Sequence, residues 1–188
     1  MAELLRALLL EIPELIETER MQLRAVRAGQ GAEVHEALVE SYPQLATWMP
    51  WAKQLQSSEE TEAYAREAQA KWLARTTLDF TWYSKDGAVV GKGGLHTIDW
   101  AIPKFEIGYW VRTTRARQGF ASEGTRALAE FARTHLGARR IEITSDARNL
   151  PSRRVAEKCG FTLEGIRLQS RRDNAGDLAD SCMYARVF

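Results

Sequence analysis

FEIGYWVR, residues 105–112, and RARQGFASE, residues 115–123, decide the fold of this chain. In the first stretch apolar side chains alternate with Glu106 and Gly108, and this period of two predicts a half-buried strand. The second stretch places Gly119 where a helical pattern begins. A glycine at a strand-to-helix junction lets the backbone approach a ligand, and free N–H groups at a helix start attract an anion. The junction therefore predicts a phosphate site.

Three arginines, Arg112, Arg115 and Arg117, surround this junction and carry planar, permanently charged donors that suit phosphate oxygens. The alternative is that they are solvated side chains at the end of a strand. The spacing is neither a P-loop nor a dinucleotide fingerprint, because both glycine patterns are absent. From Arg112 to Arg154 there are ten arginines against four carboxylates, so this region carries +6 although the whole chain carries +1. A nearly neutral chain thus contains a basic region that suits a polyanionic ligand.

The elements on both sides extend the pattern. A helical pattern from Phe120 to Leu136 precedes a strand at 141–144, and the order strand, helix, strand implies a parallel crossover. The order of elements predicts an α/β (α+β) fold, with helices on a mixed sheet. The other elements that we expect are strands at 19–26, 77–84, 88–91, 161–168 and 178–187, and helices at 34–45, 57–72 and 149–160.

The composition is that of one folded domain. A chain of 188 residues, with 45% hydrophobic and 27% charged residues, can bury one core and has no room for a second full-sized domain. The net charge of +1 gives no overall attraction to nucleic acid or to an anionic membrane, and we expect neither as a partner. Two cysteines, Cys159 and Cys182, are too few for a disulfide scaffold and favour a cytoplasmic protein.

The N-terminal segment is apolar but does not read as a signal peptide, because Arg6 interrupts it and Glu11 and Pro13 follow without a cleavage site. Its apolar positions 4, 5, 8, 9, 12, 15 and 16 have helical spacing. We therefore expect an amphipathic helical extension over residues 1–18, docked on the domain of residues 19–188 or on a second subunit. No apolar run approaches the length of a membrane span.

Several motifs follow one another along the chain: Glu106–Val111, Gln118–Glu123 and Asn149–Phe161, together with Trp48–Trp51 and Glu164-Gly165. In this order they resemble the GNAT N-acetyltransferases, specifically the RimJ/RimL ribosomal-protein branch. This resemblance extends from about Arg20 to the C-terminus, and it implies a mostly antiparallel mixed sheet with helices on both faces. The sheet would be splayed between its fourth and fifth strands, residues 105–112 and 141–144, with acetyl-coenzyme A held in the splay.

The resemblance also implies the binding residues. The pantetheine arm would pair with backbone near Trp110, Val111 and Arg112, and the N–H group of Val111 would polarise the acetyl carbonyl. Asn149 and Ser152 would face the pantetheine and its sulfur. No metal is expected, since the three histidines are scattered without ligand spacing. The pyrophosphate would lie on the N–H groups of Arg117, Gln118, Gly119, Phe120, Ala121 and Ser122.

Two positions depart from the family pattern. Ala116 stands where the phosphate loop usually has Gln or Arg, which leaves the side-chain contacts to phosphate open. Ala156 stands where many members have a tyrosine that acts as general acid. Ser152 then becomes the candidate donor to the leaving thiolate. Its alternative role is to cap the helix that begins near Asn149.

Acyl transfer to an amine requires that the amine be neutral. An α-amine, with a reference pKa of about 7.7–8.0, is neutral about a tenth of the time at pH 7, whereas lysine at about 10.4 needs a stronger base. Glu106 shares a strand face with Gly108 and Trp110, beside the implied cleft. It is the hypothesised base, directly or through a water. The alternative is a solvent-facing carboxylate on a half-exposed strand.

Three tryptophans, Trp48, Trp51 and Trp72, fall in or after the two early helices, the region that lines the acceptor groove in this family. They would form an aromatic acceptor wall or pack in the core. The sequence thus predicts transfer of an acetyl group from acetyl-coenzyme A to a primary amine in a ternary complex, by default a protein N-terminus such as that of a ribosomal protein. The alternatives are a small amine, amino acid or antibiotic as acceptor, and a non-catalytic acyl-coenzyme A-binding module. A homodimer through the N-terminal helix or the C-terminal strands stays open.

Overall fold

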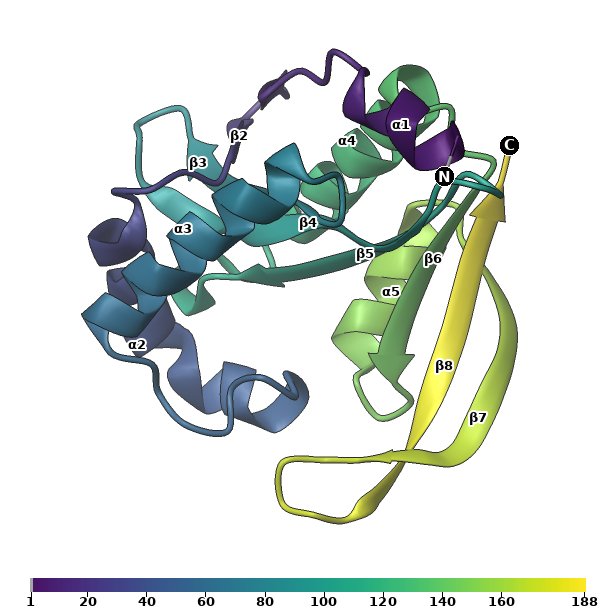
Figure 1. The fold of residues 1–188 in the computed structure, drawn as a ribbon. Helices are drawn as coiled ribbons and strands as arrows, with labels where there is room; N and C mark the ends of the chain where they lie inside the picture. The colour runs from purple at the N-terminus through teal and green to yellow at the C-terminus, as the bar shows by residue number, and fades with distance from the viewer. Residues whose placement is uncertain (1) are drawn as a thin grey trace.

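The computed structural model describes residues 2–188, which contain one eight-stranded sheet in the order β1-β2-β3-β4-β5-β6-β8-β7 (Figure 1). Only the pair β5–β6 is parallel; every other neighbouring pair in this described sheet is antiparallel, which confirms the mixed, mostly antiparallel sheet. The strands are β1 (Leu15–Glu17), β2 (Met21–Ala25), β3 (Leu78–Ser84), β4 (Val89–Asp99), β5 (Lys104–Val111), β6 (Arg140–Asp146), β7 (Thr162–Arg172) and β8 (Leu178–Val187). The helices are α1 (Ala2–Leu8), α2 (Gly31–Trp48), α3 (Ser58–Leu73), α4 (Phe120–His135) and α5 (Leu150–Lys158), with a 3-10 turn at Thr113–Arg115.

Helices cover both faces of the sheet, as the resemblance implies (Figure 1). On one face, Val34 of α2 packs with Tyr83 of β3, and Tyr64 of α3 donates a hydrogen bond to Asp79. On the other face α4 lies so close to the sheet that a Cβ on Gly124 would sit 2.4 Å from the ring of Trp82. The glycine is therefore required for this helix-to-sheet contact.

The splay between β5 and β6 is confirmed. Their parallel pairing covers only Lys104–Glu106 opposite Arg140–Glu142, although both strands continue well beyond it. The two strands then diverge, and the first turn of α5 lies beside the gap (Figure 1). Beyond Glu106 the backbone edge of β5 that faces β6 therefore has no neighbouring strand.

The N-terminal extension is helical only over Ala2–Leu8, and the expectation of a helix through residue 18 was wrong. Pro13 cannot continue a helix, and Leu15–Glu17 instead form β1, which pairs with β2. The sheet thus begins before residue 19. The docking of α1 on the domain is confirmed, because Arg75 donates hydrogen bonds to the carbonyls of Ala7 (3.3 Å) and Leu10 (2.9 Å).

Strand β4 runs to Asp99, eight residues beyond the predicted end at Gly91. Gly93 and Gly94 lie within this strand, and each is closely packed against another residue. A Cβ on Gly93 would lie 2.4 Å from Trp82, and one on Gly94 would lie 2.4 Å from the Oδ1 atom of Asp79. Close packing, not chain reversal, explains these glycines.

Candidate active site

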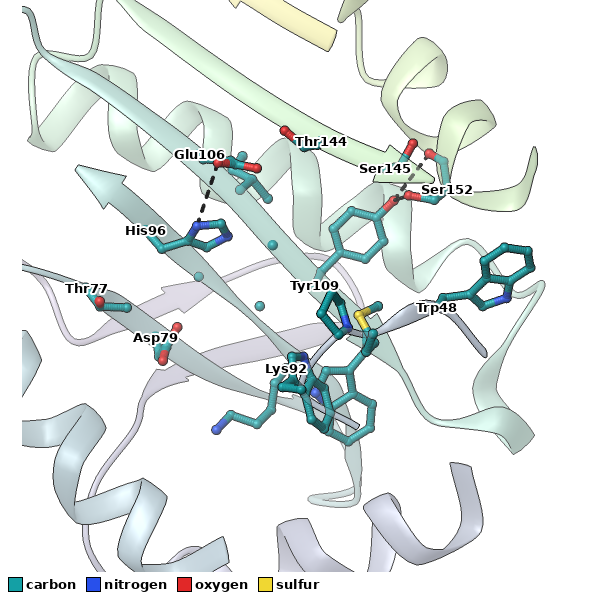
Figure 2. Close-up of a pocket in the computed structure, with 18 of the residues that line it drawn as sticks. Trp48, Thr77, Asp79, Lys92, His96, Glu106, Tyr109, Thr144, Ser145 and Ser152 are labelled. Atoms are coloured by element: carbon teal, nitrogen blue, oxygen red, sulfur yellow. Dashed lines mark hydrogen bonds and ion pairs between the residues drawn. The ribbon is translucent and has the colours of Figure 1, made fainter. Parts of the chain in front are cut away.

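A cavity of about 640 Å³ occupies the splay and continues between the sheet and helices α2 and α3. Figure 2 shows the side chains that converge on it from β3, β4, β5 and the start of α5. The sequence-predicted residues that line it are Trp48, Trp51, Glu106, Trp110, Asn149 and Ser152. The fold therefore brings the hypothesised base and the hypothesised thiolate donor to one space.

Glu106 lies on the floor of this cavity, with 20% of its side chain exposed. Its Oε2 atom accepts a hydrogen bond from Thr97 (3.2 Å) and lies 4.0 Å from Nδ1 of His96 (Figure 2). Sequence reasoning missed His96 because it set the end of this strand at Gly91. The register that pairs His96 with Glu106 across β4 and β5 explains their proximity.

Asn149 caps α5, since its Oδ1 atom accepts the N–H of Ser152 at 3.2 Å. The Ser152 hydroxyl is therefore not the cap. It lies 3.2 Å from the hydroxyl of Tyr109, which also donates to the Ser152 carbonyl at 3.4 Å. The phenol donates to the carbonyl, because a carbonyl can only accept, whereas either hydroxyl can be the donor in the contact between Tyr109 and the Ser152 side chain.

Tyr109 itself was missed, because the alternation of β5 places it on the core face, where it stacks near Trp82 with ring centroids 6.4 Å apart. The end of β5–β6 pairing at Glu106 nevertheless exposes the phenol to the splay. Burial raises the pKa of Tyr109 to about 12, partly opposed by the Ser152 hydrogen bond. The phenol therefore stays protonated at neutral pH and remains a donor.

The phosphate loop, residues 115–122, has the backbone of an anion site. Arg117 has φ +60° and Gly119 has φ +87°, which turn the chain sharply into α4. The first helical hydrogen bond is donated by Glu123 to the Gly119 carbonyl at 3.0 Å. Among residues 2–188, the N–H groups of Arg117 to Ser122 have no acceptor, so they fit a phosphate group.

Arg20 of the β1–β2 connection holds the phosphate loop in place. Its guanidinium donates to the carbonyl of Gln118 (2.8 Å) and to Glu123 (2.7 Å), and lies 4.6 Å above the ring of Phe120. Thr18 also donates to Glu123, at 2.7 Å. Burial acts to raise the pKa of Glu123, but these hydrogen bonds and the Arg20 charge hold it below its usual value. The carboxylate is thus an ionised anchor for the loop.

The three arginines at the junction have different roles. Arg112 forms an ion pair with Glu40 (2.5 Å) and Arg115 one with Asp86 (3.6 Å), so each guanidinium already faces a carboxylate of the protein, which the sequence did not indicate. Arg117 has no carboxylate partner within 4.0 Å in the described chain. It is the side chain available to a phosphate.

The backbone of Arg112 is also committed, because its N–H donates to the Val90 carbonyl at 2.7 Å. It cannot pair with a pantetheine arm through that group. Successive residues of a strand direct their N–H groups to opposite edges, so the N–H of Val111 faces the splay. This orientation fits the expected role of Val111.

The four tryptophans predicted as site residues lie in three different settings. Trp48 and the half-exposed Trp51 line the cavity, whereas Trp110 lines it and packs against Leu38 in the core. Trp72 is only 5% exposed, meets Phe80 edge-on at 5.0 Å and does not line this cavity. The expectation that Trp72 forms part of the acceptor wall was wrong, because its side chain is core packing.

Comparisons with known proteins agree with this geometry. Residues 20–162 match the family described as acetyltransferase (GNAT) domain. The ribosomal-protein-serine acetyltransferase of Escherichia coli K12 is 25% identical over 174 residues, covering 90% of this chain and 94% of that protein. YdaF of Bacillus subtilis 168 is 26% identical over 151 residues, covering 78% and 80%. A solved structure of RimL, the ribosomal L7/L12 α-N-protein acetyltransferase, in complex with coenzyme A has a TM-score of 0.88 at 25% identity, covering 93% of this chain and 98% of that one.

The sheet, the splay and the phosphate loop define an acyltransferase built to hold a thioester of coenzyme A. The chain belongs to the GNAT acetyltransferase family and is an acetyl-coenzyme A-dependent N-acetyltransferase. None of the helices in residues 2–188 combines the length and apolar character that a bilayer span requires.

Proposed function

We propose that this enzyme acetylates the N-terminal α-amine of a protein or peptide. The observation that carries the proposal is that Glu106 and Ser152 line one cavity, which continues between the sheet and helices α2 and α3, where an acceptor chain would enter. The names of the E. coli and RimL relatives, which act on ribosomal proteins, support this choice of acceptor.

Glu106 is the proposed general base. A carboxylate that is partly withdrawn from water but not ion-paired to Lys or Arg can accept the ammonium proton of an entering amine. The hydrogen bond from Thr97 fixes its orientation. The α-amine suits this weak base, since its reference pKa of about 7.7–8.0 requires far less help than that of lysine.

The cosubstrate supplies an acetyl group activated as a thioester. Its phosphates would be held by the N–H groups of Arg117 to Ser122 and by the Arg117 side chain, which fit that charge. The N–H of Val111, at the open edge of β5, would donate to the acetyl carbonyl oxygen as negative charge develops there.

Ser152 is the proposed donor to the departing sulfur. The phenol of Tyr109 donates to the Ser152 carbonyl and lies 3.2 Å from the Ser152 hydroxyl, so it holds the serine at the cavity, where its O–H would turn to the sulfur as negative charge develops there. Tyr109 is thus a positioning residue for Ser152. This arrangement replaces the tyrosine that is absent at Ala156.

The test is thiol release from acetyl-coenzyme A with a panel of peptides, free amino acids and aminoglycosides. We expect release with peptides that have a free α-amine, and none when the same peptides are N-terminally blocked but keep a lysine. Release only with small amines would overturn the peptide acceptor. Tight binding of acetyl-coenzyme A with no release from any acceptor would indicate a non-catalytic binding module.

A further inference from the structure

The floor of the cavity carries a lysine that neither the fold nor the transfer of an acetyl group requires. Lys92 lies on the same face of β4 as His96, with Gly94 between them. A Cβ on Gly94 would clash with Asp79, and one on Gly108 would lie 2.6 Å from the His96 ring. Gly94 thus makes room for Asp79 and Gly108 for the His96 ring, and Lys92 and His96 both line the cavity.

The ammonium group of Lys92 forms no close ion pair with a described residue. Its Nζ atom lies 4.3 Å from the centroid of the Tyr64 ring, and no carboxylate oxygen of the described residues comes within 4.0 Å of it. The nearby carboxylate of Asp79 accepts the Tyr64 hydroxyl instead, at 2.6 Å. Burial lowers the pKa of Lys92 to about 8, with Asp79 opposing the shift. The wall of the cavity therefore contains a charged ammonium group that is partly removed from water.

The other cations that line the cavity are already paired. Lys71 lies 2.7 Å from Glu67 one turn away on α3, and Arg171 forms an ion pair with Asp146. Among the described Lys and Arg residues that line the cavity, Lys92 is thus the one without a carboxylate within 4.0 Å. Its ammonium group has three N–H donors. A bound anion would supply the partner that the protein does not.

We propose that Lys92 binds a carboxylate of the acceptor, so that the enzyme selects peptides with an acidic residue near their N-terminus. This inference rests on the proposed function of the same cavity. Lys92 lies four residues before His96 in β4, and His96 is the cross-strand partner of Glu106. The backbone positions of Lys92 and His96 are therefore about 13 Å apart along the strand. The carboxylate of a free α-amino acid lies too close to its own amine to reach both groups. An extended peptide with Asp or Glu at its second to fourth position spans the distance.

The experiment compares acetylation of alanine-rich peptides that carry one glutamate, or one matched glutamine, at position 2, 3 or 4. For the wild type we expect kcat/KM about tenfold higher with glutamate at the best position. Lys92→Met should remove the difference while acetyl-coenzyme A binding stays unchanged, which also shows that the variant is folded. Lys92→Glu should reverse it, so that a lysine-containing peptide becomes the better acceptor. Lys158→Met, at the exposed end of α5, is the control that removes the same charge elsewhere and should keep the glutamate preference.

Equal rates for glutamate and glutamine peptides in the wild type would overturn the inference. A Lys92→Met variant that loses activity equally with both peptides would also overturn it, because Lys92 would then act on the amine or on the fold. Absence of thiol release with every peptide is a different result, since it overturns the proposed peptide acceptor and the inference with it.

Discussion

The phosphate loop and the acceptor end of the cavity, which is the part lined by Trp48, Trp51, Tyr64 and Lys92, are built in opposite ways. The loop presents backbone N–H groups of one continuous segment, residues 117–122. The acceptor end presents side chains from α2, α3, β3, β4 and β5. Backbone donors are fixed by local conformation, whereas a side-chain constellation depends on the whole fold. The loop therefore suits a cosubstrate shared by a family, and the acceptor end suits specificity.

The largest effect is expected where the acceptor amine is activated. Glu106→Gln removes the proposed base but keeps the shape and an acceptor for Thr97. We expect kcat to fall about 10²–10³-fold, with little change in acetyl-coenzyme A binding, because general-base catalysis contributes on that order. Steady-state thiol release and calorimetric titration of the cosubstrate measure the two quantities.

The matched control is Glu67→Gln on the exposed surface of α3, which should leave kcat unchanged. If Glu106→Gln retains wild-type kcat at neutral pH, Glu106 is not the base, and the acceptor end has another means of activating the amine.

The parts of the fold that could be predicted are those with local signals. The alternation in residues 105–112 and the Gly119 junction identified β5 and the start of α4, between which the anion site is expected. Asn149 and Pro151 correctly indicated the start of α5. Each signal lies within a few residues of what it specifies, so a single sequence is enough to read it.

The parts that could not be predicted depend on contacts between distant segments. His96 reaches Glu106 only through the register of β4 and β5. Tyr109 meets Ser152 only because β5 and β6 part after Glu106. The commitment of Arg112 to Glu40 joins residues 72 positions apart. No local pattern carries this information, which is why the stretch that identified β5 gave no sign of the ion pair at its end.

A second, smaller effect is expected at the sulfur. Ser152→Ala should lower kcat about tenfold or somewhat more, since one donor to a developing charge is lost. Tyr109→Phe keeps the ring that stacks on Trp82 but removes the hydroxyl, and should lower kcat severalfold. If Tyr109 acts only through Ser152, the phenylalanine substitution should have no further effect in the Ser152→Ala background.

The control for this cycle is Tyr42→Phe, which removes a hydroxyl bonded to the Lys53 carbonyl outside the cavity. Additive effects of Tyr109→Phe and Ser152→Ala would show that the phenol acts independently of the serine, for instance on the sulfur itself.

A third effect, on binding alone, is expected at the phosphate loop. Gly119→Ala strains a residue at φ +87° and places a Cβ 3.3 Å from the Arg20 guanidinium. We expect KM for acetyl-coenzyme A to rise about fivefold with kcat nearly unchanged, together with about 1 kcal/mol of lost stability. Gly137→Ala, at φ +66° with open space around it, should lose similar stability without any change in KM. A rise in KM for both variants would mean that destabilisation, not the loop, sets cosubstrate affinity.

The smallest effect is expected at the anchor behind the loop. Because hydrogen bonds from Thr18 and Arg20 outweigh burial and hold the pKa of Glu123 below its usual value, its ionised form stabilises the fold. That contribution is complete above the unfolded-state pKa of about 4.3 and is lost as pH falls through the lower pKa of the folded state. Glu123→Gln should therefore cost about 1 kcal/mol at pH 7, with a difference from the wild type that narrows below about pH 4. Thermal unfolding at both pH values measures it. A difference in stability that stays constant with pH would show that Glu123 anchors the loop by shape and not by charge. The comparison of the phosphate loop with the acceptor end would then no longer include a charged anchor behind the loop.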